Sequence, residues 1–384
     1  MKQYDYIITG AGCAGLSLLV RMIDSGRFAG KQILLLDKAP KTSNDRTWCF
    51  WEKGDGCFES IVYKQWEHTA VYGNQFSKQF DLSPYRYKMI RGIDFYNYCF
   101  NKINACSNID VQYGTISNPY YHKEGITMTI DGVAQQFGHA TVFNSIWREE
   151  TIRQQSSIYL LQHFKGWVIE TASPVFNSSE AILMDFRVPQ TYGTTFAYLL
   201  PLTANSALVE YTLFSEKLLE ADDYKKGLAE YIEQQLGITA YTITAEEFGV
   251  IPMTNAEFPW YANGVFHIGT AGGQTKASSG YTFQFIQKQT AAIVQSLADG
   301  TLDKARQPLP TPRRFHFYDS VLLHILAKKK LCGDAVFTRL FEKNTAQAVF
   351  KFLDNETSLA EELSIIKCLP TGVFLRAALA QWRG

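Results

Sequence analysis

The first part of the chain decides the fold. It reads Tyr4-Asp-Tyr-Ile-Ile-Thr-Gly-Ala-Gly-Cys-Ala-Gly15, continues through a mainly apolar stretch, and reaches Gln32-Ile-Leu-Leu-Leu-Asp37. The two apolar runs are typical of short buried strands, and residues 13–26 between them have the spacing of a helix. A strand, a tight turn, a helix and a second strand within about 35 residues predict a βαβ unit, whose strands run parallel because the crossover is long.

Three glycines stand at the junction of the first strand and the helix, with the spacing Gly10-x-Gly12-x-x-Gly15. They permit a tight turn, close approach of the backbone to a pyrophosphate, and close packing of helix on strand. The pyrophosphate would lie against unpaired N–H groups around Ala11 at the helix N-terminus, and Asp37 would accept hydrogen bonds from the adenosine ribose. A chance glycine triplet is the alternative, but the order of strand, helix, strand and acid favours a dinucleotide site. The signature does not separate FAD from NAD.

A second glycine-rich turn follows an apolar run later in the chain. It reads Val265-Phe-His-Ile-Gly269-Thr-Ala-Gly-Gly273. Flavoproteins of the aromatic hydroxylase type carry a similar element, usually G-D-A, although here a threonine replaces the acid. Arg91 at the head of a helical segment is another similarity, with a solvated arginine as its alternative. The resemblance implies FAD, and implies that it contacts Gly269, Thr270, Gly272, Gly273 and Arg91.

Composition limits the class of function. The chain has 384 residues, with 37 Lys and Arg against 37 Asp and Glu, so its formal net charge is zero. Nucleic acid is therefore not expected as the main partner, because a polyanion needs an excess of basic side chains. The seven cysteines form no C-x-x-C pair and the seven histidines show no metal-ligand spacing. We expect reduced thiols, a cytoplasmic protein and no metal site. No apolar run approaches the ~18 residues needed to cross a bilayer.

The predicted fold class is α/β (α+β). A Rossmann-like βαβ domain for FAD is joined to an inserted, largely antiparallel substrate-domain sheet. Residues 58–82 alternate loosely between polar and apolar, and residues 158–171, 180–188, 194–200 and 206–214 alternate more clearly. Most of the chain after the Pro-rich linker at 307–312 has helical spacing instead. The expected parts are an FAD-binding domain at 1–57, 84–157 and 245–306, a substrate-binding sheet domain at 58–83 and 158–244, and a helical C-terminal element at 307–384.

Several segments together, in this order, resemble the lycopene cyclase family of carotenoid enzymes. They are Asn44-Asp-Arg-Thr-Trp-Cys-Phe-Trp51, Met184-Asp-Phe-Arg187, Phe196-Ala-Tyr-Leu-Leu-Pro201, Ala207-Leu-Val-Glu-Tyr-Thr-Leu-Phe214, Phe248-Gly-Val-Ile-Pro-Met253 and the stretch from Gly269 to Phe283. The family often has two consecutive acids in the central motif, whereas here Tyr211 follows Glu210. The resemblance implies cyclisation of lycopene to β-rings, giving β-carotene via γ-carotene. It also implies reduced FAD as the active cofactor, with NAD(P)H only as its reductant.

That chemistry has requirements that the residues can be tested against. A proton must reach a terminal double bond, a carbocation must be kept from water, and a proton must leave after ring closure. The donor must be a carboxyl group with a raised pKa. Glu210 lies in a run that is apolar on both faces, where burial favours the neutral acid, so with the resemblance we predict it to be the donor. A glutamate paired with Lys or Arg is the alternative. Trp48, Trp51 and Tyr281 are expected to line the polyene cavity, or to be core aromatics.

The C-terminal segment is basic and apolar. Residues 313–384 hold 11 Lys and Arg against 7 Asp and Glu, and a cluster at 328–330 is all lysine. We expect part of this segment to lie on a membrane, with apolar side chains inserted and lysines near anionic head groups. A helical cap over the FAD domain is the alternative. The alternative function is an FAD-dependent monooxygenase or oxidoreductase acting on an apolar substrate, and a carotenoid- or flavin-binding module without turnover is a third.

Overall fold

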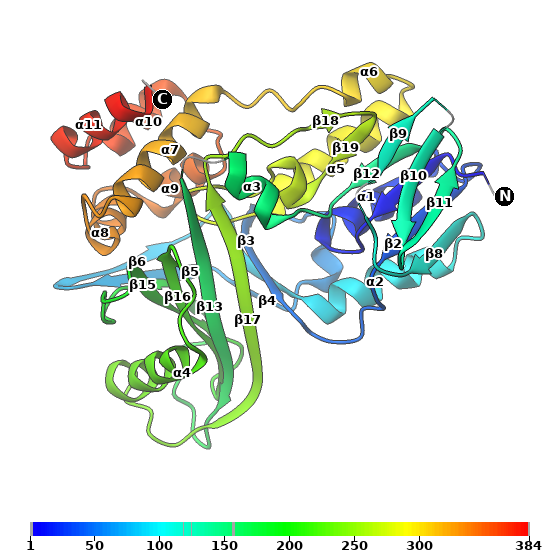
Figure 1. Ribbon diagram of the computed structural model, residues 1–384. Coiled ribbons are helices and arrows are strands. Elements are labelled where there is room, and N and C mark those ends of the chain that lie inside the picture. The colour runs from blue at the N-terminus through cyan, green and yellow to red at the C-terminus, as the bar shows by residue number, and fades with distance from the viewer. Residues whose placement is uncertain (1–2, 118, 124, 156–157, 383–384) are drawn as a thin grey trace.

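The N-terminal βαβ unit lies at the centre of a mixed, mainly parallel sheet. The computed structural model describes residues 3–117, 119–123, 125–155 and 158–382, and within them this sheet has six strands in the order β18-β19-β12-β1-β2-β8 (Figure 1). All described neighbours are parallel except β18, which pairs antiparallel with β19. Their bounds are Tyr261–Ala262 (β18), Val265–His267 (β19), Thr141–Asn144 (β12), Tyr6–Thr9 (β1), Ile33–Asp37 (β2) and Ile109–Tyr113 (β8).

Both faces of this sheet are covered. The helices α1 (Cys13–Asp24), α2 (Gly92–Asn104) and α5 (Phe283–Ala298) share a core with Ile8 and Leu35 on one face. A small antiparallel sheet covers the other face; its strands are β9 (Tyr120–His122), β10 (Gly125–Ile130) and β11 (Val133–Phe137). Because both faces are covered, β2 is buried along its whole length, and its sequence is apolar up to Asp37.

A second, seven-stranded sheet carries the long strands. Its order in the described chain is β17-β13-β16-β15-β14-β5-β6, and only β14 and β5 pair in parallel. The bounds are Thr242–Thr254 (β17), Tyr159–Glu170 (β13), Ser206–Ser215 (β16), Thr194–Pro201 (β15), Glu180–Asp185 (β14), His68–Gly73 (β5) and Phe76–Asp81 (β6). The helix α4 (Ala221–Glu230), continued by a π-turn at Tyr231–Gln235, packs on one face. The predicted, largely antiparallel sheet is therefore present.

A three-stranded sheet connects the two large ones. It consists of β3 (Thr47–Lys53), β7 (Tyr85–Arg91) and β4 (Lys64–Trp66), and β7 leads directly into α2. The buried amine of Lys88 on β7 pairs with Glu52 and Glu59, at 3.0 and 2.5 Å. Shorter elements complete the chain: the helices α3 (Glu149–Gln155) and α6 (Leu302–Ala305), and 3₁₀ turns at Glu59–Ile61 and Gly269–Gly272.

The C-terminal region is helical, as the sequence predicts. Figure 1 shows these helices gathered at one end of the molecule, next to β5 and β6. They are α7 (Arg313–Ala327), α8 (Gly333–Lys343), α9 (Ala346–Leu353), α10 (Leu359–Ile366) and α11 (Thr371–Trp382). Phe337, Phe341 and Phe350 share one hydrophobic core with the seven-stranded sheet. A capping box of Ser358 and Glu361 starts α10.

These sheets and helices confirm the predicted fold class, a Rossmann-like βαβ unit with an inserted, mainly antiparallel sheet and a helical C-terminal region. The strands also show how far each element extends. β17 belongs to the seven-stranded sheet and runs to Thr254, past the expected boundary at 244 and 245. A strand end is set by its pairing with β13, which lies far away in the sequence.

We expect Gly15→Ala to destabilise the protein by about 1–3 kcal/mol, because added atoms in a well-packed contact force the backbone to shift. A Cβ on Gly15 would lie 2.0 Å from the carbonyl oxygen of Gly10 and 3.1 Å from Cγ2 of Ile8. Gly30 is the matched control, since its Cβ would meet no atom within 4 Å. The free energy of unfolding in urea, measured for both variants, checks this. Equal stability of Gly15→Ala and Gly30→Ala would contradict it.

Candidate active site

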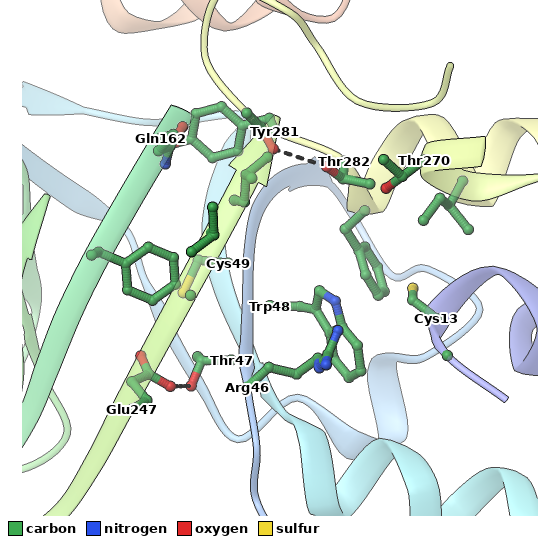
Figure 2. A pocket seen from close by; sticks show the side chains of 18 of the residues that line it. Cys13, Arg46, Thr47, Trp48, Cys49, Gln162, Glu247, Thr270, Tyr281 and Thr282 are labelled. Atoms are coloured by element: carbon green, nitrogen blue, oxygen red, sulfur yellow. Dashed lines mark hydrogen bonds between the residues drawn. The ribbon is translucent and has the colours of Figure 1, made fainter. Parts of the chain in front are cut away.

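A cavity of ≈ 440 Å³ lies between the start of α1 and the seven-stranded sheet. Figure 2 shows side chains from widely separated parts of the chain around this space, among them Cys13, Trp48, Gln162, Glu247 and Tyr281. Much of the wall is aromatic: Trp48, Tyr87, Trp147, Phe164, Tyr198, Phe248, Tyr281 and Phe283. A cavity with an apolar wall and a few polar groups is typical of small-molecule sites.

One end of the cavity is formed by the predicted dinucleotide loop. Gly10 has φ +97°, which side chains other than glycine rarely adopt. Gly12 is the N-cap of α1 and lines the cavity. A Cβ placed on Gly12 would have no other atom within 4 Å. The backbone is thus open to a ligand where the helix has unpaired N–H groups, and this arrangement fits an anionic pyrophosphate.

Asp37 lies at the end of β2 and fastens this loop. Its Oδ2 accepts a hydrogen bond from the backbone N–H of Ala11 at 2.5 Å. Its Oδ1 accepts from the N–H of Ala39 at 3.2 Å and from Nζ of Lys41 at 3.1 Å. The carboxylate therefore holds the glycine loop in place through these hydrogen bonds. A contact between Asp37 and the adenosine ribose stays a prediction.

The second glycine-rich turn separates two cavities. Gly269, with φ +62°, and Thr270 line the first cavity. Gly272 and Gly273 line another cavity, of ≈ 780 Å³, on the other side of the turn. A Cβ on Gly272 would lie 2.1 Å from the carbonyl oxygen of His267, so this glycine serves close packing. Only part of the predicted set thus faces the start of α1.

Arg91 is not among the described residues that line either cavity, which differs from the prediction. Its guanidinium donates to both carboxylate oxygens of Asp94, at 2.6 and 2.9 Å, and stacks 3.9 Å from the ring centre of Tyr63. Arg46 lines the first cavity instead, as does Cys13 (Figure 2). The Arg46 guanidinium is paired with Asp45 at 3.0 Å. Arg46 lies within a segment that carries the family resemblance, but nothing in the sequence distinguishes it from Arg91 as a cavity residue.

The predicted proton donor lies at the other end of the cavity. Glu210 on β16 is paired with Gly166 on β13, and Gly166 is paired in turn with Glu247 on β17. The two acids thus lie in one row across three strands, on the same face of the sheet, and both line the cavity. Oε2 of Glu247 accepts a hydrogen bond from Oγ1 of Thr47 at 2.8 Å (Figure 2).

Burial is the main reason why the pKa of Glu210 lies well above its ordinary value. The hydrogen bond to Glu247 and the charge of that second carboxylate raise the pKa further. The carboxyl group is enclosed by protein, and part of its surface is open to the cavity. These effects all favour the neutral acid over the carboxylate, as a proton donor requires. Sequence reasoning missed Glu247, because only the register of β17 shows which of its acids faces Glu210.

Three tyrosines surround the acid. Tyr198 on β15 is the direct strand neighbour of Glu210, and its hydroxyl hydrogen-bonds with that of Tyr281. Tyr87 also hydrogen-bonds with Tyr281. Burial raises the pKa of Tyr281 to about 12 and the pKa of the other two phenols well above their ordinary value, so all three are neutral. Their rings give this end of the cavity electron-rich faces.

The two predicted tryptophans have different places. Trp48 lines the cavity and packs edge-on against Phe95. Trp51 is not among the described lining residues, contrary to the prediction, because its ring stacks on Phe350 at 4.3 Å behind Tyr281. Its Nε1 donates to Oδ2 of Asp354 at 2.8 Å. Trp51 therefore supports the wall that Tyr281 presents.

Comparison with known proteins gives the family. The family model described as lycopene cyclase protein matches residues 5–379. The chain belongs to the lycopene cyclase family. The resemblance found in the sequence segments is thus confirmed.

Relatives of this lycopene cyclase family member are distant in sequence. A lycopene beta-cyclase of Pantoea ananas is 24% identical over 287 residues, which cover 73% of this chain and 71% of that protein. A chloroplastic neoxanthin synthase of Solanum lycopersicum is 23% identical over 319 residues, covering 78% of this chain and 61% of that protein. The chain therefore spans less than two thirds of the neoxanthin synthase.

Solved structures share the fold at still lower identity. The flavin-dependent brominase Bmp2 matches with a TM-score of 0.62 at 11% identity, with 100% of both chains covered. pqsL, a probable FAD-dependent monooxygenase from Pseudomonas aeruginosa, matches with 0.61 at 13% identity over 88% of this chain and 99% of its own. A geranylgeranyl bacteriochlorophyll reductase-like protein from Thermoplasma acidophilum matches with 0.59 at 11%, over 100% and 97%. These likenesses show the fold alone.

No group of three or more His, Cys, Asp or Glu side chains in the described part of the chain is arranged to hold a metal ion. Among the helices described, none combines the length and the apolar character that crossing a bilayer requires.

We expect Asp354→Asn to stabilise the protein at pH 8 and not at pH 4. Burial raises the folded-state pKa of Asp354 to about 6. Its contribution to stability is therefore full below about pH 4, where both states are protonated, and is lost as the pH rises through 6. Asparagine stays neutral and can still accept from Trp51, so the gain at pH 8 is about 1–3 kcal/mol.

Urea denaturation at both pH values measures this difference. Asp303→Asn is the control, because the side chain of Asp303 is 92% exposed. The same change in stability at pH 4 and pH 8 would refute the assignment to Asp354.

Proposed function

We propose that this protein is a lycopene cyclase that works with reduced FAD and without net redox change. The observation that carries the proposal is the position of Glu210, an acid enclosed by protein except toward the cavity, with a raised pKa, at one end of an aromatic cavity. The other end of that cavity is the glycine-bounded N-terminus of α1. Membership of the lycopene cyclase family supports a carotenoid substrate.

The cofactor proposal rests on the dinucleotide loop. FAD would hold its pyrophosphate against the open backbone at Gly12, with Arg46 as a nearby cation, and its flavin end would meet Gly269 and Thr270. When reduced, FAD supplies negative charge that stabilises a developing carbocation. NAD(P)H is proposed only as the reductant, since the sequence has a single G-x-G-x-x-G motif.

The residues of this chain would handle one proton. Glu210 transfers its carboxyl proton to a terminal double bond of lycopene, which leaves a carboxylate and a carbocation. A second double bond attacks the cation and closes the ring, and loss of a proton from the adjacent carbon forms the ring double bond. One proton enters and one leaves, so the β-ring product is an isomer of the substrate. The faces of Trp48, Phe164 and Tyr198 stabilise the passing positive charge.

A flavin monooxygenase acting on an apolar substrate is the second candidate. The observation in its favour is the fold, which this chain shares with pqsL and other flavin-dependent enzymes. Fold alone does not decide the reaction, because function depends on the site. A monooxygenase needs O₂ and changes the mass of its substrate. Cyclisation needs no O₂ and leaves the mass unchanged.

The decisive assay supplies lycopene in liposomes with FAD and NADPH under anaerobic conditions. We expect a product with β-rings and unchanged mass, detected by its absorption spectrum and by mass spectrometry. Glu210→Gln should reduce the initial rate by at least about 10²-fold, the usual contribution of general acid catalysis, and should still bind FAD.

The matched control is Glu246→Gln. Glu246 is exposed and forms an ion pair with Lys165 at 2.5 Å, away from the cavity lining. This variant should keep the wild-type rate. Product that requires O₂ would favour the monooxygenase, and unchanged lycopene would reject both enzymes in favour of a binding module.

For its surroundings, we propose a cytoplasmic protein at the membrane face. All seven cysteines are free, as in a reducing compartment. On α11, Leu375, Leu379 and Trp382 are spaced along one side of the helix and are 58, 52 and 81% exposed; on α10, Leu359 and Leu363 are 60 and 70% exposed. We call these five residues the C-terminal apolar stripe.

Basic residues flank the C-terminal apolar stripe. Lys367 and Arg376 are exposed on or next to α10 and α11, and Lys328, Lys329 and Lys330 are exposed at the end of α7, against which α11 packs. Apolar side chains bordered by cations fit a bilayer with anionic head groups. Because the proposed substrate dissolves in lipid, contact with the bilayer would give the protein access to it.

Flotation with vesicles tests the membrane contact. We expect the protein to float with vesicles that contain phosphatidylglycerol and less with phosphatidylcholine alone. Replacing both Leu375 and Leu379 with Ser should reduce the floated fraction severalfold, because each loses roughly 1.5–3 kcal/mol of apolar burial. Leu218→Ser, at an exposed leucine elsewhere, is the control. Flotation that does not depend on the stripe would reject this surface.

A further inference from the structure

The register of three strands brings two carboxyl groups together. Within one row of the sheet, Glu210 faces Gly166, and Gly166 faces Glu247. Side chains in adjacent positions of neighbouring strands are close, but those two strands apart are normally separated by the residue between them. Here that residue is a glycine, so no side chain separates the two glutamates.

The two acids lie so close to Gly166 that a larger residue would not fit at this position. A Cβ on Gly166 would be 2.9 Å from Cγ of Glu247 and 3.1 Å from Cγ of Glu210, closer than side-chain carbons pack. Gly166 does not have a positive φ, so its backbone conformation is open to any residue. Its lack of a side chain therefore makes room for the two acids and for Cδ1 of Leu208, which would lie 3.1 Å from the Cβ, and does not serve the shape of the strand.

The hydrogen bonds of Glu247 fit a carboxylate that shares a proton with its neighbour. Its Oε2 accepts a hydrogen bond from the hydroxyl of Thr47. Oε1 is buried and receives no hydrogen bond from any other described donor group. The carboxyl group of Glu210, when protonated, is placed to donate to Glu247.

The other titratable groups near the pair are either neutral or already paired with an opposite charge. Cys49 on β3, Tyr198 on β15 and Tyr281 have pKa values raised by burial, and the charges of the two acids add to the shift of Cys49. The cation on the same strand as Gly166, Lys165, is paired with Glu246. Arg46 lines the same cavity but is paired with Asp45. Among the described groups that shift the pKa of Glu210, no cation stabilises its ionised form.

We propose that Glu210 and Glu247 hold one proton between them across Gly166, with Glu210 as the donor to the substrate and Glu247 as its positioning residue. The inference rests on the proposed cyclase function and adds a reason why Glu210 holds its proton until the substrate takes it. After Glu210 gives its proton to the double bond, two carboxylates face each other, and this repulsion favours return of a proton to the pair. The proton that leaves the ring carbon is the one that returns, so the pair ends in its starting state.

Infrared titration of the protein without substrate tests the shared proton directly. The protonated carboxyl band that disappears in Glu210→Gln is followed from pH 5 to pH 10. We expect Glu247→Gln to lower the midpoint of this titration by one pH unit or more, which corresponds to a tenfold lower proton affinity. Gly166→Ala should shift it the same way by separating the acids. Glu246→Gln, the adjacent acid on β17, should leave the midpoint unchanged.

Kinetics provide the second readout. In Glu247→Gln the alkaline limb of the kcat profile for lycopene should move to lower pH by the same amount, with activity retained on the acidic side. A residue needed only for packing would lower kcat at every pH. An unchanged infrared midpoint in Glu247→Gln overturns the proposal, even if the protein cyclises lycopene. A shifted midpoint in a protein that leaves lycopene unchanged supports the pair and rejects the reaction instead.

Discussion

One electrostatic constraint shapes the site: the carboxyl group of Glu210 must stay protonated inside the protein and still face the cavity. Burial of a charged carboxylate is costly, whereas the neutral acid needs only a hydrogen-bond partner. Glu210 meets this condition through its long central strand and through Glu247, whose own charge makes ionisation of Glu210 less favourable. The empty position at Gly166 makes the contact possible. The protonated state of Glu210 thus depends on the sheet register and on a missing side chain.

The two ends of the cavity have opposite electrostatic character. The start of α1 presents unpaired N–H groups and has Arg46 nearby, so it favours negative charge. The far end holds the acids and three neutral phenols, so it disfavours a further negative charge and tolerates a positive one. A dinucleotide and a cationic intermediate would therefore each find a matching end. The mainly parallel sheet positions the first end, and the seven-stranded sheet positions the second.

The elements that depend on local pattern could be predicted from the sequence. The βαβ unit, the glycine spacing and the helical C-terminal region follow from periodicity and turn chemistry, and Glu210 follows from its motif together with an apolar strand. The partners of those elements could not be predicted. Glu247 stands beside Glu246 in the sequence, and only the pairing of β17 with β13 decides which of the two faces the cavity.

Side-chain direction limits the prediction in the same way. Arg91 and Arg46 both lie close to motifs in the sequence, but Arg91 finds Asp94 one helical turn away and so pairs outside the cavity. Trp48 and Trp51 lie on the same strand, three positions apart, so they face opposite sides of it. One side is the cavity and the other is the core shared with α9. These differences arise from contacts between distant segments, which no local pattern records.

The C-terminal helices support the cavity wall from behind, in addition to forming part of the surface. Phe350 on α9 stacks on Trp51 with ring centres 4.3 Å apart, and Trp51 packs edge-on against Tyr281 at the same distance. Tyr281 hydrogen-bonds with both phenols beside Glu210. A continuous line of packed rings thus joins α9 to the acid, and α10 packs against α9. Close-packed interiors transmit displacement, so a bilayer that holds α10 and α11 would act on the same wall that shapes the reacting end of the cavity.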